Sequence, residues 1–264
     1  TVGYSANALG GAGGPLAVLI IAIVAAELGK AVSKETKIDI LATPLVTIFA
    51  GVGLSMLIAA PIGAAASQVG TLIMWATEQA PLVMGILVSV IVGVALTLPI
   101  SSAAICAALG LTGLAGGAAV AGCCAQMVGF AVMSYKENGV GGLVSQGLGT
   151  SMLQMGNIIK NPRIWIAPTL ASAITGPLAT CLFHFEMNGA AVSSGMGTCG
   201  LVGQIGVYTG WVNDIAAGTK AAITPMDWVA MLLICFVLPA VLSVVFCEIE
   251  RKLGWIKEGD LKLN

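Results

Sequence analysis

The chain has 264 residues, of which 58% are hydrophobic and only 9% charged, and its mean hydropathy is +1.00. An ordinary soluble domain carries about 25% charged residues, so this composition excludes that class and indicates a membrane protein. The formal net charge is −1 and there is no long basic run, which excludes a protein held on nucleic acid by charge.

Several apolar runs approach or reach the roughly 20 residues that cross a hydrocarbon core of about 30 Å. Short alternating segments typical of outer-membrane barrels are absent, so the spans are predicted to be helices, which satisfy their own backbone hydrogen bonds in lipid. The sequence therefore predicts an all-α, multi-pass transmembrane helix bundle. In chain order, the predicted spans are Pro15 to Val32, Ile38 to Ala60, Pro81 to Ile100, Leu114 to Met133, Ile164 to Phe183 and Met226 to Cys247.

Two places in the first half interrupt this pattern. The stretch from Gly63 to Ala80 is only weakly apolar and includes Gln68 and Glu78, which fits an amphipathic helix at the membrane interface as well as it fits a connecting loop. Near the end of the third span, Pro99 lies between Thr97 and Ser102. Because proline lacks a backbone donor, this site predicts a broken helix.

Two later segments, Gly139 to Asn161 and His184 to Trp211, are too polar or too rich in glycine to be plain spans. Irregular backbone at membrane depth persists only where protein or a water-filled cavity covers it, so both are candidate re-entrant hairpins. Their sequences are similar, since Gly-Leu-Gly-Thr-Ser at 147–151 corresponds to Gly-Met-Gly-Thr-Cys at 195–199. Paired interrupted segments indicate a transporter binding site, and the alternative is a chance similarity in a chain so rich in glycine.

Glu186 is the most informative side chain, because a charge at the bilayer centre costs about 3 kcal/mol and usually marks a substrate or ion pathway. The alternative is a glutamate near the interface that ends the preceding helix. His184, the only histidine, points to the same side as Glu186 if the segment is extended. The candidate substrate-binding residues are Glu186, His184, Asn188, Thr150, Ser151, Gln154, Ser193, Ser194, Thr198 and Gln126.

The sequence predicts no catalytic residues, no metal site and no cofactor. One histidine cannot form H-E-x-x-H or a convincing Ser-His-Asp set. Gly195 to Gly200 fits G-x-G-x-x-G, but it lacks the preceding strand that a dinucleotide site needs. The seven cysteines lie mostly in apolar stretches and are interpreted as packing residues. Trp211 suits either an aromatic belt or a sugar-stacking surface, and Asp227 is expected to cap the final span.

Clusters of lysine and arginine predict which loops are cytoplasmic. They comprise Lys30, Lys34 and Lys37, then Lys160 and Arg163, and finally Arg251, Lys252, Lys257 and Lys262. The first residue is threonine and no charged segment precedes Pro15, so no signal peptide is expected.

The segments 147–154, 160–172 and 195–206, with 98–104 and 122–127 upstream, resemble the membrane IIC component of bacterial phosphotransferase-system sugar transporters of the glucose superfamily. The nearest branch is that of IIC-like toxin regulators similar to the perfringolysin regulator. The resemblance covers most of the chain. It implies a homodimer in the bacterial cytoplasmic (inner) membrane, and re-entrant hairpins that form a sugar site and move in an elevator-like manner. The hairpin glutamate matches Glu186, whereas the family histidine normally lies in the earlier hairpin.

The resemblance implies three functional regions within one membrane domain. Residues 1–138 hold N-terminal spans, 139–225 the substrate-binding hairpins, and 226–264 the final span and a cytoplasmic tail. The leading hypothesis is a transporter subunit for a small polar solute, a sugar or polyol, served by a separate cytoplasmic IIB protein. The alternatives are a membrane sensor or regulator, a phosphotransferase-independent transporter, and a carrier of ions or organic anions that would use Lys160 or Arg163.

Overall fold

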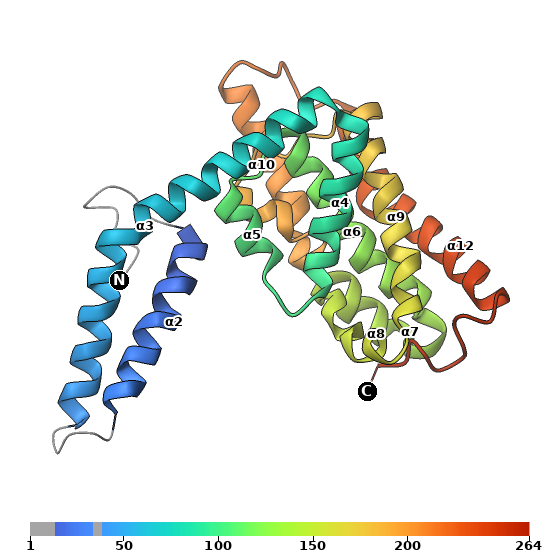
Figure 1. Ribbon diagram of the computed structural model, residues 1–264. Helices are drawn as coiled ribbons and strands as arrows, with labels where there is room; N and C mark the ends of the chain where they lie inside the picture. Colours follow the sequence, from blue (N-terminus) through green and yellow to red (C-terminus); the bar gives the residue numbers. More distant parts are fainter. Residues whose placement is uncertain (1–13, 34–38, 264) are drawn as a thin grey trace. The chain divides into compact units, whose positions relative to one another are not determined.

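A computed structural model describes residues 14–33 and 39–263 (Figure 1). The described residues form helices and turns without a strand, which confirms the all-α prediction. They divide into two compact units, the first comprising residues up to Thr71 with Ala107–Leu109, and the second comprising Leu72–Cys106 with Gly110 onward. Lys34 and Lys37, which the sequence places in a cytoplasmic loop, lie outside the described residues.

The first unit contains helix α2 (Gly14–Val32) and most of helix α3 (Asp39–Gln79). Their small residues meet in antiparallel register, with Ala17 packed in one cluster with Ala59 and Gly51 facing Ala25. Helix α3 contains residues 39–60 of the second predicted span and residues 63–79 of the segment that follows it, and it continues without a break through Pro61. That segment is therefore helix rather than loop up to Gln79, and its location at a membrane interface stays a prediction.

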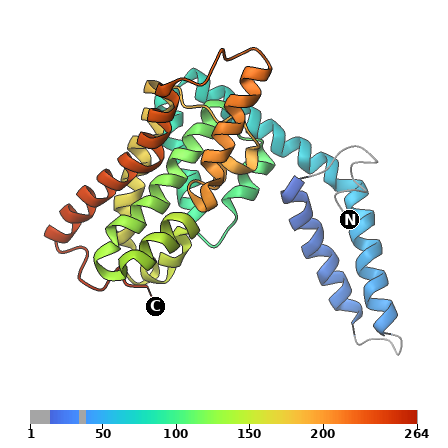
Figure 2. The same ribbon diagram turned by 180° about the vertical axis from the view of Figure 1, so that it is seen from behind.

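In the second unit, helix α6 (Gly113–Met133) lies between α4 (Pro81–Thr97), α9 (Ile166–Pro177) and α12 (Leu238–Lys252) (Figures 1 and 2). Almost all of α6 is buried, since its glycines and alanines allow neighbouring backbones to approach closely. At Gly122, for example, a Cβ atom would collide with the carbonyl group of Ser89 in α4.

The predicted break near the end of the third span is confirmed. Helix α4 ends at Thr97, Leu98 is extended with ψ 156°, and α5 begins at Ser102 and ends at Leu109. Among the described residues, four stretches are long and apolar enough to cross a membrane, compared with six predicted spans. They are Asp39–Gln79, Gly113–Met133, Pro162–Leu182 and Pro225–Lys252, whereas the apolar helix Pro81–Thr97 is shorter.

The segment predicted as the first hairpin is a chain of short helical pieces. It comprises α7 (Tyr135–Val144), a π-turn η1 (Ser145–Gly149), a 3-10 turn η2 (Ser151–Gln154) and α8 (Met155–Lys160). Helix α7 bends at Gly139, whose φ of +59° lies in the left-handed region that glycine tolerates. These interruptions distinguish the segment from a plain span, and its position at membrane depth stays a prediction.

The second such segment is also interrupted. It contains the 3-10 turns η5 (Ala191–Gly195) and η6 (Cys199–Leu201) and then helix α10 (Val202–Ala216). Turns η1 and η6 contact one another, so the two similar glycine-rich sequences meet beside α6. The last span is α11 (Pro225–Leu232), a π-turn η7 (Leu233–Val237) and α12, while η3 (Pro162–Trp165) and η4 (Leu178–Leu182) flank α9.

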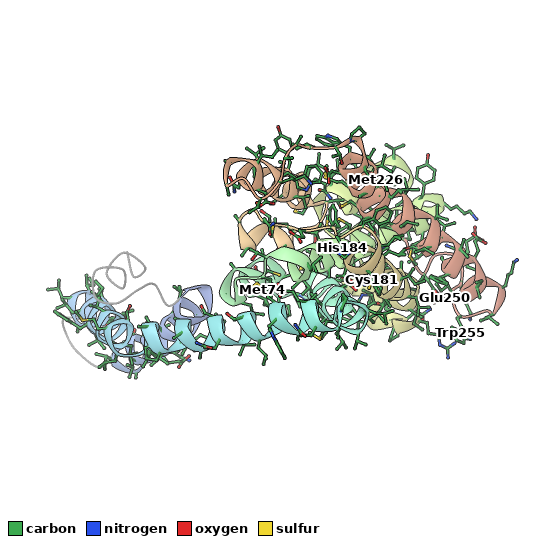
Figure 3. The ribbon with its side chains drawn as sticks, turned by 90° about the horizontal axis from the view of Figure 1, so that it is seen from above. Met74, Cys181, His184, Met226, Glu250 and Trp255 are labelled. Atoms are coloured by element: carbon green, nitrogen blue, oxygen red, sulfur yellow. The ribbon has the colours of Figure 1, made fainter. Side chains whose placement is uncertain are left out.

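Glu250 on α12 is an unusual buried acid, and Figure 3 marks its place. It is 4% exposed, and neither carboxylate oxygen has a hydrogen-bond partner among the described residues. A buried charge without a partner is strongly unfavourable. Two residues earlier, Glu248 accepts a hydrogen bond of 2.9 Å from Lys136 at the surface.

We expect Glu250→Gln to increase the free energy of unfolding by about 1 kcal/mol or more, because the substitution removes a buried charge. The midpoint of thermal unfolding should rise accordingly. The measurement is thermal unfolding in a fixed detergent at pH 8. Glu248→Gln is the matched control and should change the midpoint little, since exposed ion pairs contribute about 0 to 1 kcal/mol. A lower midpoint for Glu250→Gln would show that the carboxylate is stabilised in the folded protein.

Candidate functional site

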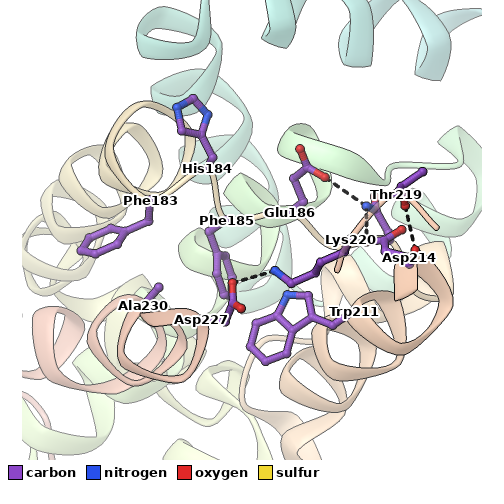
Figure 4. Close-up of a pocket in the computed structure, with 11 residues that line it drawn as sticks. Phe183, His184, Phe185, Glu186, Trp211, Asp214, Thr219, Lys220, Asp227 and Ala230 are labelled. Carbon is purple, nitrogen blue, oxygen red and sulfur yellow. Dashed lines mark hydrogen bonds and ion pairs between the residues drawn. The ribbon is translucent and has the colours of Figure 1, made fainter. Parts of the chain in front are cut away.

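A cavity of about 460 Å³ opens beside the segment that follows α9 (Figure 4). Its size falls within the range of about 300 to 1,000 Å³ typical of small-molecule sites. The residues that line it come from this segment, from α10 and its following loop, and from α11: Phe183, His184, Phe185, Glu186, Asn188, Trp211, Asp214, Thr219, Lys220, Asp227 and Ala230. Three of the ten predicted site residues, His184, Glu186 and Asn188, therefore share one cavity.

The first lining segment is held against the N-terminus of α6. Gly113 and Met187 exchange two backbone hydrogen bonds, of 3.1 and 3.0 Å, as in an isolated antiparallel bridge. The backbone N–H of Phe185 donates to the carbonyl of Ala179 at 2.8 Å, which ties the segment to the end of the preceding helix. At Gly117, one turn along α6, a Cβ atom would collide with the carbonyl of Phe185.

Side chains alternate along this segment. Phe185 and Met187 are buried, whereas His184 and Glu186 are exposed at the cavity, on the side away from Phe185 in Figure 4. His184 and Glu186 therefore point to the same side of the segment, as predicted. His184 has a φ of +44°, so the backbone turns there and is extended only afterwards.

Asn188 holds two carboxylates close together. Its Nδ2 donates to Glu186 Oε2 at 3.0 Å and to Asp214 Oδ2 at 2.9 Å, while its Oδ1 accepts from the backbone N–H of Gly113 at 3.1 Å. These bonds use both amide hydrogens of Asn188. The Oε1 of Glu186 and the Oδ1 of Asp214 have no hydrogen bond from the described residues, so each remains an acceptor for a ligand's hydroxyl group.

Lys220 and Asp227 add an ion pair to the lining of the cavity. Lys220 Nζ donates to Asp227 Oδ1 at 2.8 Å and lies 5.6 Å from the centroid of the Trp211 ring. Asp227 also forms a capping box with Thr224, which confirms that it caps the final span. Trp211 packs edge-on against Trp228, with 5.6 Å between ring centroids.

The remaining predicted residues lie outside this cavity. Gln126 Oε1 accepts from Trp165 Nε1 at 2.9 Å and from Thr97 at 3.2 Å, and Ser151 bonds to the same threonine at 2.8 Å. Thr150 caps η2 by accepting from the N–H of Met152. These contacts join α4, α6 and the first interrupted segment, so in this conformation the three residues bond to the protein itself.

Gln154 is buried against the C-terminal tail. Its Nε2 donates to the carbonyl of Leu261 at 3.0 Å and to Gln146 Oε1 at 2.9 Å. Ser194 donates to the carbonyl of Leu111 at 2.7 Å. Ser193 and Thr198 are also buried, and Thr198 Oγ1 has no partner among the described residues. Whether these side chains contact a solute stays a prediction.

The basic residues that an anion carrier would need do not line the cavity of Glu186. Arg163 lies over the Trp255 ring at 5.6 Å, and Lys160 lines a separate hollow with Asn157 and Lys262. No group of three or more histidine, cysteine, aspartate or glutamate side chains suitable for a metal ion occurs in the described part of the chain.

Sequence reasoning did not assign Asp214, Lys220 and Asp227 to the site. They lie 26 or more residues after Asn188: Asp214 is in the last turn of α10, Lys220 is in the loop that follows, and Asp227 is in the first turn of α11. The Thr-Pro-x-Asp pattern at 224–227 signals a helix start, and it gives no sign that the aspartate also binds a lysine.

We expect Gly117→Ala to weaken the site, because the added methyl group must displace the carbonyl of Phe185. Overpacking of this kind costs about 1 to 3 kcal/mol of unfolding free energy. The measurement is thermal unfolding, combined with the accessibility of a cysteine introduced at Ala190. Gly141→Ala is the control, since a Cβ there meets nothing within 4 Å. Equal unfolding midpoints for the two variants would contradict the assigned contact.

We expect Gln154→Ala to loosen the tail, because the substitution removes the donor to Leu261. The measurement is the rate of trypsin cleavage after Lys257, which should rise about threefold or more for a lost hydrogen bond of about 1 kcal/mol. Met152→Ala, an exposed neighbour, is the control. An unchanged cleavage rate would show that the hydrogen bond does not hold the tail.

Comparison with protein families gives one match. The model of the family described as "Phosphotransferase system, EIIC" matches residues 2–263. The comparisons with curated proteins and with solved structures found no match.

Proposed function

Because the chain belongs to the phosphotransferase system EIIC family, a family of sugar-transport membrane subunits, we propose that the cavity beside Glu186 is its solute site. The observation that supports this most directly is the convergence of Glu186, Asn188 and Asp214 on one hollow of about 460 Å³. A small neutral solute with many hydroxyl groups, a sugar or a polyol, suits such acceptors.

Carboxylate oxygens accept hydrogen bonds only, and sugar hydroxyls donate them. Glu186 Oε1 and Asp214 Oδ1 would each accept a hydroxyl, while His184 at the rim can donate or accept. Asn188 uses both of its amide hydrogens on the two carboxylates. Its role is therefore to position them, and the direct contacts to the solute fall to Glu186 and Asp214.

The cavity and the basic residues lie at opposite ends of the second unit, and this arrangement supports uptake of the solute from outside the cell. In Figure 1 the loop between α10 and α11 lies at one end of this unit, and α8 and the C-terminus lie at the other. The basic residues Lys160 and Arg163 and the tail lie at that other end, which the positive-inside rule assigns to the cytoplasm. On this reading a solute enters from outside the cell and meets a separate cytoplasmic IIB protein after translocation.

Two further elements of the proposal come from the family. The subunit would work as a homodimer in the bacterial cytoplasmic membrane, and the region of residues 139–225 would carry the solute across by an elevator-like movement. Cross-linking between single-cysteine variants in native membranes, with and without solute, would test both, since a rigid monomer would give neither a dimer band nor a solute-dependent change.

We expect Glu186→Gln to bind its solute about tenfold or more weakly, because a hydrogen bond to a charged acceptor contributes about 1.5 to 3 kcal/mol. A thermal-shift screen of hexoses and hexitols in nanodiscs first identifies the ligand, and calorimetry then compares the native and variant proteins. Glu258→Gln, an exposed glutamate of the tail, is the control. Full affinity in Glu186→Gln would remove this carboxylate from the site.

Uptake into liposomes separates transport from sensing. Accumulation of the labelled solute, with the phosphoryl donor components enclosed, is expected of a transporter subunit. Binding without accumulation under these conditions would instead favour the membrane sensor or regulator.

A further inference from the structure

Lys220 covers the aromatic wall of the cavity. Its ammonium group lies 5.6 Å from the centroid of the Trp211 ring and is held there by Asp227 at 2.8 Å. Figure 4 shows the lysine side chain extending between Trp211 and Phe185. Trp211 lines the cavity but is only 5% exposed: it belongs to a buried cluster with Phe185 and Ala230, Trp228 packs edge-on against it, and Lys220 lies over its ring.

The contacts that hold Lys220 are of a size that a ligand can replace. The side chains of Lys220 and Asp227 are 27% and 21% exposed, so water reaches their ion pair and partly screens it, and a cation–π contact contributes between about 0.5 kcal/mol at an exposed site and about 2 kcal/mol at a desolvated one. Lys220 is part of a turn after α10, where its N–H and that of Thr219 bond to the carbonyl of Asp214. Gly218 begins this turn with φ +77°, so the loop leaves α10 abruptly.

We propose that Lys220 is a displaceable cover, and that a bound solute moves its ammonium off Trp211 and stacks an apolar C–H face on the indole. This inference rests on the proposed function, since it takes the same cavity as the solute site. The ammonium group and a solute ring cannot occupy the same face of Trp211 together. Lys220 thereby acts as a specificity-determining residue.

The cover selects for the shape of the solute. A ligand that displaces Lys220 must replace the favourable free energy of its contact with Trp211. A pyranose ring does so by packing one flat apolar face against this large aromatic surface. An open-chain hexitol also carries hydroxyl groups along its length but has no rigid face, and it loses conformational freedom on binding. The site should therefore prefer pyranose sugars over hexitols, with Glu186 and Asp214 receiving the hydroxyl groups that point away from the ring.

The test compares calorimetric affinities of native protein, Lys220→Met and Lys220→Arg in nanodiscs. The probes are D-glucose, D-mannose and D-glucitol. Lys220→Met keeps an apolar chain and leaves Asp227 with its two bonds from Thr224. Lys220→Arg keeps a cation that can lie over the ring. Lys257→Met, in the exposed tail, controls for the loss of a positive charge elsewhere.

We expect Lys220→Met to bind the pyranose about three- to tenfold more tightly than native protein does. The affinity of Lys220→Arg should stay near that of native protein. For D-glucitol, the gain in affinity on Lys220→Met should be smaller. Raising the salt concentration should strengthen pyranose binding in native protein and leave Lys220→Met unchanged, because salt screens the pair that holds the cover. A purely structural lysine would produce neither difference.

The outcomes separate the two proposals. If native protein binds a pyranose and Lys220→Met binds it equally or more weakly, the cover is wrong and the proposed function stands. If both proteins bind only the hexitol, ring stacking is wrong. If no probe binds to native protein or to any variant, the proposed solute site fails and the cover with it.

Discussion

The close approach of backbones around α6 is the constraint on which the second unit depends. A helix built of glycine and alanine can be buried on every side only if its neighbours come near enough to touch its backbone, and α4, α9 and α12 do so. The same property extends to its N-terminus. There Gly113 exchanges backbone hydrogen bonds with Met187, and Gly117 lies against the carbonyl of Phe185, where an added side chain would displace the extended segment that carries the exposed Glu186.

The arrangement of charges in the site follows from this contact between the segment and α6. Once Met187 is bridged to Gly113, the next residue, Asn188, is placed where its amide reaches both Glu186 and Asp214. Two carboxylates that share one amide repel each other modestly across a partly solvated cavity, and they leave two oxygens unused. Lys220 forms its ion pair with Asp227, and no salt bridge joins it to Glu186 or Asp214 among the described residues. The hollow is consequently rich in acceptors and poor in donors.

Much of this was predictable from the sequence. Apolar runs predicted the helices, Pro99 the break after α4, and Glu186 with Asn188 the polar wall. The single helix α3 was not predicted as such, because the weakly apolar character of residues 63–80 suggested an end that the backbone does not make. Sequence patterns also could not show which of the ten candidate residues line the cavity and which bond to other parts of the protein. Whether Gln154 faces a cavity or the carbonyl of Leu261 depends on a tail that is more than 100 residues away along the chain.

That tail has a consequence for how the protein could be observed. Leu261 is fully buried, with its N–H on Glu137 and its carbonyl on Asn138 and Gln154, and Leu263 donates to Asn138. The chain end is thus an integral part of the fold, anchored to the interrupted segment between α7 and α8. A spectroscopic label attached near residue 263 would follow any displacement of that segment without altering the cavity beside Glu186.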